Sequence, residues 1–157
     1  MRLTLQTDYA LRILIYLATR PDETVTVRSI AESYGISTNH VATVAKRLVR
    51  EGLVEGYRGH SGGLRLAHEA LDTRVGDVVR SFEPGLDLVE CLRADGECAI
   101  EPACRLKGAL ERARKAFMDV LDEMTIASLA GNAPRLVRLL SRSTRAARRT
   151  PGRSSGK

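Results

Sequence analysis

The sequence predicts a mainly α-helical protein with a small β-hairpin wing: a winged helix-turn-helix followed by a long dimerisation helix. Three observations predict this fold. Apolar residues recur at helical spacing through most of the chain, two short helical patterns flank a glycine, and a glycine-rich segment separates two runs with strand character. We expect four parts: residues 1–83 as the winged helix-turn-helix, 84–104 as a cysteine loop, 105–141 as the dimerisation helix with a C-terminal helix, and 142–157 as a basic disordered tail.

The 157 residues suit one domain with an extension, and no apolar run is long enough to cross a membrane. The first residues include Asp8 and Arg12 and do not form a signal peptide, so we expect a cytoplasmic protein with reduced thiols and no membrane partner. The formal charge of +6 is unevenly distributed: residues 142–157 hold six basic and no acidic side chains, residues 1–67 carry +3, and residues 68–141 carry −3. The tail can add non-specific attraction to phosphates.

The first predicted helix spans residues 8–19, with Thr7 as its N-cap. It is apolar almost all round, which is typical of a helix buried on more than one side. One side can therefore pack on its own domain and the other on a partner chain. Within this helix Asp8 and Arg12 are the only charged residues, and their spacing of four residues allows an ion pair along the helix.

Two short helices follow and form the helix-turn-helix pattern. The first has apolar residues at helical spacing from Val27 and ends at Gly35, and we expect Ser37 to cap the second. The second helix has an apolar face and an opposite polar and basic face, whose N-terminal half can read base edges. The alternative is an ordinary helical hairpin with a solvated charged face. The candidate DNA-binding residues here are Arg28, Ser37, Thr38, Asn39, His40, Thr43 and Lys46.

A β-hairpin is predicted from two strand-like runs, residues 53–58 and 64–66, around a glycine-rich turn. Glycine keeps the tip small enough to enter a minor groove, where the local potential attracts arginine. Arg58, His60 and Arg65 therefore join the candidate DNA contacts. The order helix, helix-turn-helix, hairpin is more specific than any of its parts and predicts binding to double-stranded DNA.

All three cysteines, Cys91, Cys98 and Cys104, lie in one acidic segment with glycine and proline, which we expect to be a loop. A short helix at residues 75–82, stopped by Pro84, precedes it. An odd number of thiols in a short loop fits a disulfide framework poorly. Three soft thiolates suit zinc or an iron–sulfur cluster, although neither a Cys-x-x-Cys pair nor a following His pair is present. The alternative is three unrelated cysteines, buried as small apolar residues.

After the loop, the pattern predicts a helix from Arg105 to about Met124. Its apolar residues alternate spacings of four and three, a heptad seam that is typical of a dimer interface. The members of the seam are Leu106, Leu110, Ala113, Phe117, Val120 and Met124. A homodimer would present two DNA-reading units to a palindromic operator, whose half-site spacing is strict. A last short helix is expected at residues 135–141.

Three stretches resemble the Rrf-type winged-helix regulators. The opening residues Thr7-Asp8-Tyr9-Ala10-Leu11-Arg12 and the wing residues Gly62-Gly63-Leu64-Arg65-Leu66 resemble the family as a whole. The stretch Pro102-Ala103-Cys104-Arg105-Leu106 is similar to its branch of nitric-oxide-sensing repressors, the NsrR type. The resemblance covers about residues 1–140 and leaves the basic tail outside.

The resemblance implies a homodimeric transcriptional repressor, not an enzyme, that holds an iron–sulfur cluster through Cys91, Cys98 and Cys104. It implies that Asp8 of the partner subunit is the fourth ligand of a 4Fe–4S cluster, which we favour over 2Fe–2S, and that nitrosylation of the cluster releases DNA. The sister branch that regulates iron–sulfur biogenesis has a histidine where this chain has Lys107, a protonated amine and no ligand. Three alternatives stay open: a regulator of iron–sulfur or cysteine metabolism with the same fold, a small redox or electron-transfer protein, and a zinc-binding structural regulator.

Overall fold

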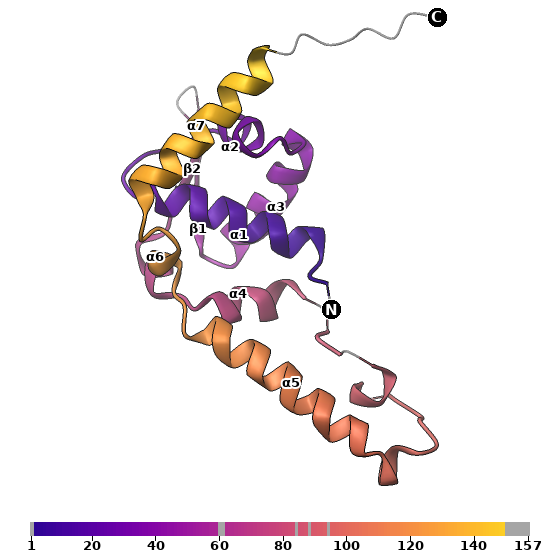
Figure 1. The fold of residues 1–157 in the computed structure, drawn as a ribbon. Coiled ribbons are helices and arrows are strands. Elements are labelled where there is room, and N and C mark those ends of the chain that lie inside the picture. The colour runs from indigo at the N-terminus through magenta and orange to yellow at the C-terminus, as the bar shows by residue number, and fades with distance from the viewer. Residues whose placement is uncertain (1, 60–61, 84, 88, 94, 150–157) are drawn as a thin grey trace, which may run out of the picture.

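The computed structural model describes residues 2–59, 62–83, 85–87, 89–93 and 95–149, with the helical backbone alone at 143–149. A helical N-terminal unit with a two-stranded hairpin carries a long projecting helix (Figure 1), so the predicted fold class is confirmed. The helices are α1 (Leu5–Ala18), α2 (Val27–Tyr34), α3 (Thr38–Arg50), α4 (Val75–Phe82), α5 (Arg105–Asp122), α6 (Ile126–Leu129) and α7 (Ala133–Arg149). The strands are β1 (Val54–Tyr57) and β2 (Gly63–Leu66), and short 3-10 helices lie at His68–Asp72, Glu90–Leu92 and Glu101–Ala103.

Helix α1 is the central helix of the N-terminal unit and packs against α3, α4, α6 and β2, as its apolar sequence predicts. It begins earlier than expected. Thr4 is the N-cap, and its hydroxyl accepts a hydrogen bond from the backbone N–H of Thr7 at 3.3 Å. The prediction of Thr7 as the cap was wrong because Thr7 is fully buried and its hydroxyl instead donates to Glu83.

Helices α2 and α3 form the predicted helix-turn-helix. Helix α2 ends at Gly35, whose φ of 64° is a left-handed conformation that glycine adopts without strain. Helix α3 buries the predicted apolar face, made of Val41, Val44, Ala45 and Leu48. Ser37 occupies the N-cap position of α3 as predicted, but its side chain makes no capping hydrogen bond.

The hairpin pairs β1 and β2 antiparallel, with Val54 opposite Leu66. Leu64 exchanges backbone hydrogen bonds of 2.9 and 2.7 Å with Val25, which attach the hairpin to the segment before α2. Glycine is required at position 63 because a Cβ there would lie 2.5 Å from the carbonyl oxygen of Val25. The first strand is one residue shorter at each end than predicted, and the second begins one residue earlier.

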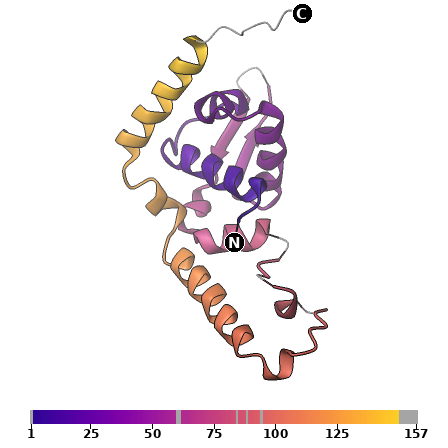
Figure 2. The ribbon, with the colours of Figure 1, turned by 45° about the vertical axis from the view of Figure 1, so that its right-hand side comes forward.

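Helix α5 leaves the N-terminal unit as an arm (Figures 1 and 2). An ion pair between Arg80 and Asp122 and a hydrogen bond of 2.8 Å from Val75 N to the Met124 carbonyl hold its base against α4. Along the arm Met118 is the one buried residue. The predicted heptad seam is therefore exposed or half-buried in a single chain and is available to a partner chain.

Helix α7 is longer than predicted. We expected a helix at residues 135–141 and a disordered tail from residue 142, whereas the helix runs from Ala133 to Arg149. The prediction for residues 142–149 was wrong because arginine and alanine are good helix formers, so a run of like charge does not prevent the helix from continuing. The rest of the expected tail lies outside the described residues. Within them, no helix has the length and apolar character needed to cross a membrane.

Candidate DNA interface and metal centre

The N-terminal half of α3 presents the predicted base-reading residues to solvent. Ser37, Thr38, Asn39, His40, Thr43 and Lys46 are all exposed. The hydroxyl of Thr43 donates to the Asn39 carbonyl at 2.9 Å, and the ring of His40 lies 5.9 Å from the ring of Tyr9 on α1. The residues that the sequence placed on one helix face thus lie on one open face of the molecule.

A groove of about 760 Å³ lies between α3 and the hairpin. Its lining includes Val49 and Tyr57, whose exposed fractions of 39% and 45% are large for apolar or aromatic residues. Lys46, Arg50 and Arg58 also line it, and among the described residues no ion pair includes them. The groove therefore combines an apolar surface with three available positive charges, which suits a sugar–phosphate backbone.

Two predicted DNA contacts are engaged within the chain, and a third falls outside its described part. Arg65 donates to the Pro21 carbonyl at 3.2 Å and pairs with Asp22 at 3.5 Å, so it attaches the hairpin to the turn before α2. Arg28 pairs with Glu32 at 2.8 Å but keeps 82% of its side chain exposed. His60 lies outside the described residues. Arg58 is thus the wing side chain best placed to reach DNA.

Arg47 joins the recognition helix α3 to α4, a role that sequence reasoning missed. Its guanidinium lies 4.2 Å from the ring centroid of Phe82, donates to the Ser81 carbonyl, and donates to Glu51 at 2.9 Å. The hydroxyl of Ser81 also donates to Glu51 at 2.7 Å. These contacts fix α3 to the last turn of α4.

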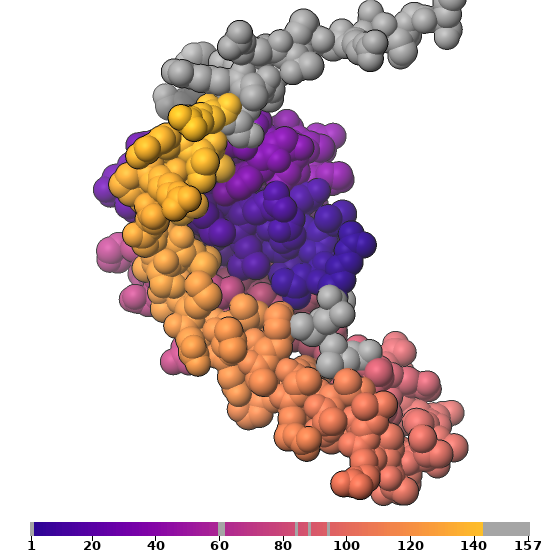
Figure 3. All heavy atoms as spheres, in the orientation of Figure 1, coloured from indigo at the N-terminus to yellow at the C-terminus, as the bar shows by residue number. Residues whose placement is uncertain are grey.

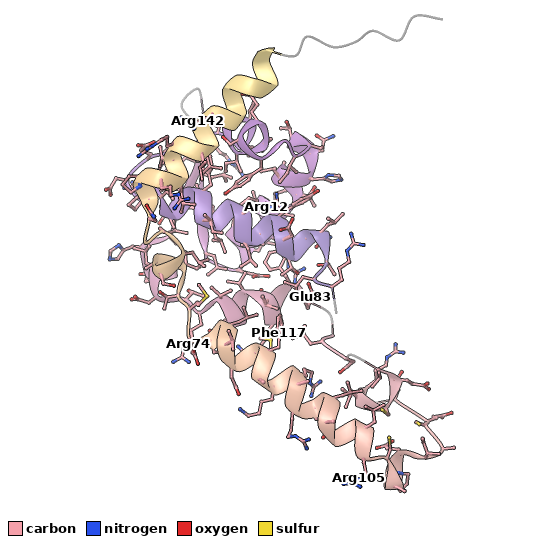
Figure 4. All side chains as sticks on the ribbon, in the orientation of Figure 1. Arg12, Arg74, Glu83, Arg105, Phe117 and Arg142 are labelled. Atoms are coloured by element: carbon pink, nitrogen blue, oxygen red, sulfur yellow. The ribbon has the colours of Figure 1, made fainter. Side chains whose placement is uncertain are left out.

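Glu83, directly after α4, holds the start of α1 (Figure 4). Its carboxylate accepts hydrogen bonds from Thr4 N at 2.8 Å, from the Thr4 hydroxyl at 3.1 Å and from the Thr7 hydroxyl. A carboxylate at a helix N-terminus is favoured by the unpaired N–H groups and the helix dipole. The segment 81–83 therefore contacts both α1 and α3 and leads directly into the cysteine loop. No local sequence signal predicts contacts between residues so far apart in the chain.

The three cysteines are free and half-buried. The loop that holds them turns back on itself at Gly96, where an added Cβ would lie 2.4 Å from the Glu90 carbonyl oxygen and 3.2 Å from the Cα of Cys91. Only glycine permits this approach, which returns the chain toward Cys91 before Cys98 follows. Most of the described backbone hydrogen bonds here are local turns, so the loop can rearrange around a bound group.

The loop has the right donors for an iron–sulfur cluster without a preformed metal geometry. Three sulfur atoms on one loop are the soft ligands that such clusters take. Among the described residues, however, no group of three or more His, Cys, Asp or Glu side chains is arranged to hold a metal ion. Lys107 donates to Glu101 at 2.5 Å, and this hydrogen bond raises the pKa of the lysine. The protonated form of Lys107 is therefore favoured, and an ammonium group has no lone pair with which to bind a metal.

Asp8 forms an ion pair with Arg12 in the single chain. The Oδ2 atom lies 2.9 Å from Nη2, and Oδ1 accepts from Nε at 3.0 Å. Both side chains remain about 40% exposed, at 40% for Asp8 and 42% for Arg12. The carboxylate is thus accessible on the surface of α1. Arg12 is the partner that helical spacing predicts for Asp8, and among the described residues no contact within the chain brings Asp8 to the cysteines.

Residues 3–132 match the Rrf2 family, described as an iron-dependent transcriptional regulator. The chain is 44% identical over 142 residues to the HTH-type transcriptional regulator NsrR of Bacillus subtilis, which covers 89% of this chain and 97% of the relative. It is 43% identical over 142 residues to the NsrR of Shouchella clausii, with coverage of 89% and 95%.

Solved structures show the same fold. The cysteine regulator CymR of B. subtilis superimposes with a TM-score of 0.69 at 30% identity and covers 83% of this chain and 97% of its own. T. potens IscR gives a TM-score of 0.66 at 28% identity, with coverage of 85% and 88%. The family match includes the helix-turn-helix, the wing, the cysteine loop and the arm.

Proposed function

Because this chain belongs to the Rrf2 family of transcriptional regulators and is of the NsrR type, we propose that it is a homodimeric repressor that senses nitric oxide through an iron–sulfur cluster. Membership of the family makes it a DNA-binding transcriptional regulator and not an enzyme. The observation that carries the sensor proposal is the position of the cysteine loop. Three free thiols lie in the segment that follows Glu83, and Glu83 itself holds the start of α1.

In this proposal Cys91, Cys98 and Cys104 hold the cluster, and Asp8 of the partner subunit provides the fourth ligand. We favour 4Fe–4S over 2Fe–2S. A cluster held there would supply a centre that can react with nitric oxide, and the residues of the loop would couple its loss to weaker DNA binding. A carboxylate is a hard ligand that binds iron more weakly than thiolate does. Asp8 is exposed and can pair with Arg12 of its own helix. Arg12 is therefore an alternative partner for the carboxylate when it no longer binds the cluster.

The contacts of the segment 81–83 give a route from the loop to the DNA-reading helix. A shift of the loop acts directly on Glu83, which holds α1, and on Phe82 and Ser81, which hold Arg47 of α3. The two recognition helices of a dimer must match the spacing of two half-sites, so a small rotation of α3 weakens binding to a palindrome. The same contacts thus link loading of the loop to DNA affinity.

On DNA, α3 would lie in the major groove and the hairpin would reach the adjacent minor groove. The DNA backbone between the major and the minor groove would pass along the groove of the protein that is lined by Lys46, Arg50 and Arg58. Asn39 and His40 stand at the exposed start of α3, where bidentate contacts to base edges can be made.

Selection from random double-stranded DNA, with anaerobically purified protein, tests this function. We expect enrichment of an inverted repeat whose half-sites are about one helical turn apart, or a multiple of it. The same protein with Cys98→Ser should be free of iron and give little enrichment. Enrichment of a single half-site, or equal enrichment by both proteins, would contradict a cluster-dependent dimeric repressor.

A further inference from the structure

Helix α7 carries the whole excess positive charge of the protein. It contains six arginines and no acid, and the formal charge of the chain is +6. Arg135, Arg138 and Arg142 follow each other at spacings of three and four, which places them on one side of the helix. The sequence repeats this spacing at Arg145 and Arg149.

The three described arginines are available to a partner. Arg135, Arg138 and Arg142 are exposed, and among the described residues no ion pair includes them. Figure 3 shows the described part of α7 on the outer surface of the molecule, and Figure 4 labels Arg142 on it. Uncompensated arginines at regular spacing favour a partner with regularly spaced negative charges.

The apolar side of α7 is already occupied. The helix packs along α2, and Leu140, only 8% exposed, joins the hydrophobic core. Leu136 and Val137 are half-buried, whereas Leu139 is 53% exposed. A helix that lies on a membrane needs a free apolar face to enter the lipid. This packing therefore disfavours a membrane, because most of the apolar side is covered and the exposed arginines dominate the remaining surface.

The position of α7 indicates which polyanion it meets. It packs on α2, the first helix of the helix-turn-helix. Both ribbon views show its C-terminal half at one end of the molecule, and the arm α5 points toward the opposite end. The basic surface thus adjoins the first helix of the helix-turn-helix and is remote from the acidic cysteine loop (Figures 1 and 2).

We propose that the arginine side of α7 binds DNA backbone phosphates that flank the bases read by α3 and the wing. The inference rests on DNA binding, which family membership gives, and does not depend on the cluster. The helix lies beyond residue 132, where the family match ends. It would raise the affinity for DNA of any sequence without adding base preference, because phosphate contacts do not carry sequence information.

The test compares the wild-type chain with the triple variant R135Q/R138Q/R142Q in DNA titrations over a range of salt concentrations. Each phosphate contact contributes about 0.9 to the slope of log affinity against log salt, so the slope should fall by about 2 or more. The ratio of operator to random-sequence affinity should stay the same. A triple lysine variant, R135K/R138K/R142K, keeps the charge and should keep most of the slope.

The matched control R74Q/R112Q/K115Q removes three exposed positive charges, one from the N-cap of α4 and two from α5, and should retain the wild-type slope. An unchanged slope in the α7 variant, or an equal fall in the control, would overturn the inference. If the α7 variant lost binding to phosphatidylglycerol vesicles but kept its DNA binding, the inference would also be overturned, because α7 would then be a membrane anchor. A wild-type chain that binds DNA but ignores nitric oxide would instead contradict the proposed sensor and leave this inference standing.

Discussion

At the scale of single residues, Asp8 has two competing partners. In one chain it pairs with Arg12, and in the proposed dimer it binds the cluster of the partner subunit. The two roles separate experimentally because an exposed ion pair along a helix contributes only about 0.3–0.5 kcal/mol to the free energy of unfolding. Loss of the ion pair alone should not change the cluster, so a change in the cluster on substitution of Asp8 would indicate that Asp8 is a ligand.

We predict that Asp8→Ala retains a cluster with an altered visible spectrum, weaker operator binding and a smaller response to nitric oxide. Three thiolates can still hold the cluster with water or an added thiol as fourth ligand. Arg12→Met is the matched control, because it breaks the same ion pair and leaves the carboxylate. Equal spectra for both variants and the wild type would exclude Asp8 as a ligand.

The exposed residues of α3 differ in what they contribute to DNA binding. We predict that Asn39→Ala weakens binding to the cognate site by about 1–3 kcal/mol and relaxes base preference, because a bidentate base contact is lost. Lys46→Ala should weaken binding to all sequences and reduce its salt dependence. Titrations of cognate and random duplexes measure both effects, and equal losses on the two duplexes for the Asn39 variant would contradict base reading.

At the scale of elements, the last turn of α4 links the cysteine loop to α3 through Arg47. We predict that Arg47→Met leaves the iron content unchanged but lowers the ratio of DNA affinities of the loaded and iron-free forms by several-fold. The methionine fills similar space but loses the contacts to Phe82 and Ser81. Arg47→Lys should recover little, because lysine lacks the planar group that stacks on a ring.

Arg28→Met is the control for this prediction, since it also removes a positive charge from the helix-turn-helix. Arg28 contacts Glu32 on its own helix, so its loss should change both affinities alike and keep their ratio. If Arg47→Met also keeps the ratio, α3 receives no signal through α4.

Elements with local signals were predictable from the sequence, and contacts between distant elements were not. Gly35 marks the end of α2, and the helix predicted at residues 75–82 is α4 itself. The start of α1 was misplaced because both Thr4 and Thr7 can cap a helix, and the choice depends on Glu83, which is 76 residues beyond Thr7. Helix α7 packs against α2, a contact that its own residues do not reveal, whereas its continuation to Arg149 agrees with the helix propensity of arginine and alanine.

In the candidate site, too, the local features were predictable and the contacts between distant elements were not. The thiolate donors of the candidate metal centre were predictable, because three cysteines in one acidic loop are visible in the sequence. The exposed face of α3 followed from helical spacing. The engagement of Arg65 with Asp22 was not predictable, because it depends on how the hairpin folds against the turn before α2. Which chain provides Asp8 remains a proposal that rests on the dimer.

At the scale of the whole molecule, the arm α5 is the expected dimer interface. Val120 lies on the heptad seam and is 58% exposed, so its substitution leaves the single chain folded. We predict that Val120→Glu weakens dimerisation at least tenfold, which corresponds to about 1.4 kcal/mol, because like charges would meet across the seam. Sedimentation equilibrium measures this. Arg112→Glu, on the outer side of the same helix, should dimerise as the wild type does.

The central claim is that the state of the cysteine loop controls DNA binding. The most direct measurement is an anaerobic titration of the loaded protein on its selected duplex with nitric oxide, in which DNA anisotropy and visible absorbance are recorded together. We predict that DNA release follows the change in absorbance, and that the Cys98→Ser variant responds in neither signal. DNA that stays bound while the absorbance changes, or DNA binding by the iron-free variant as tight as that of the loaded protein, would contradict the claim.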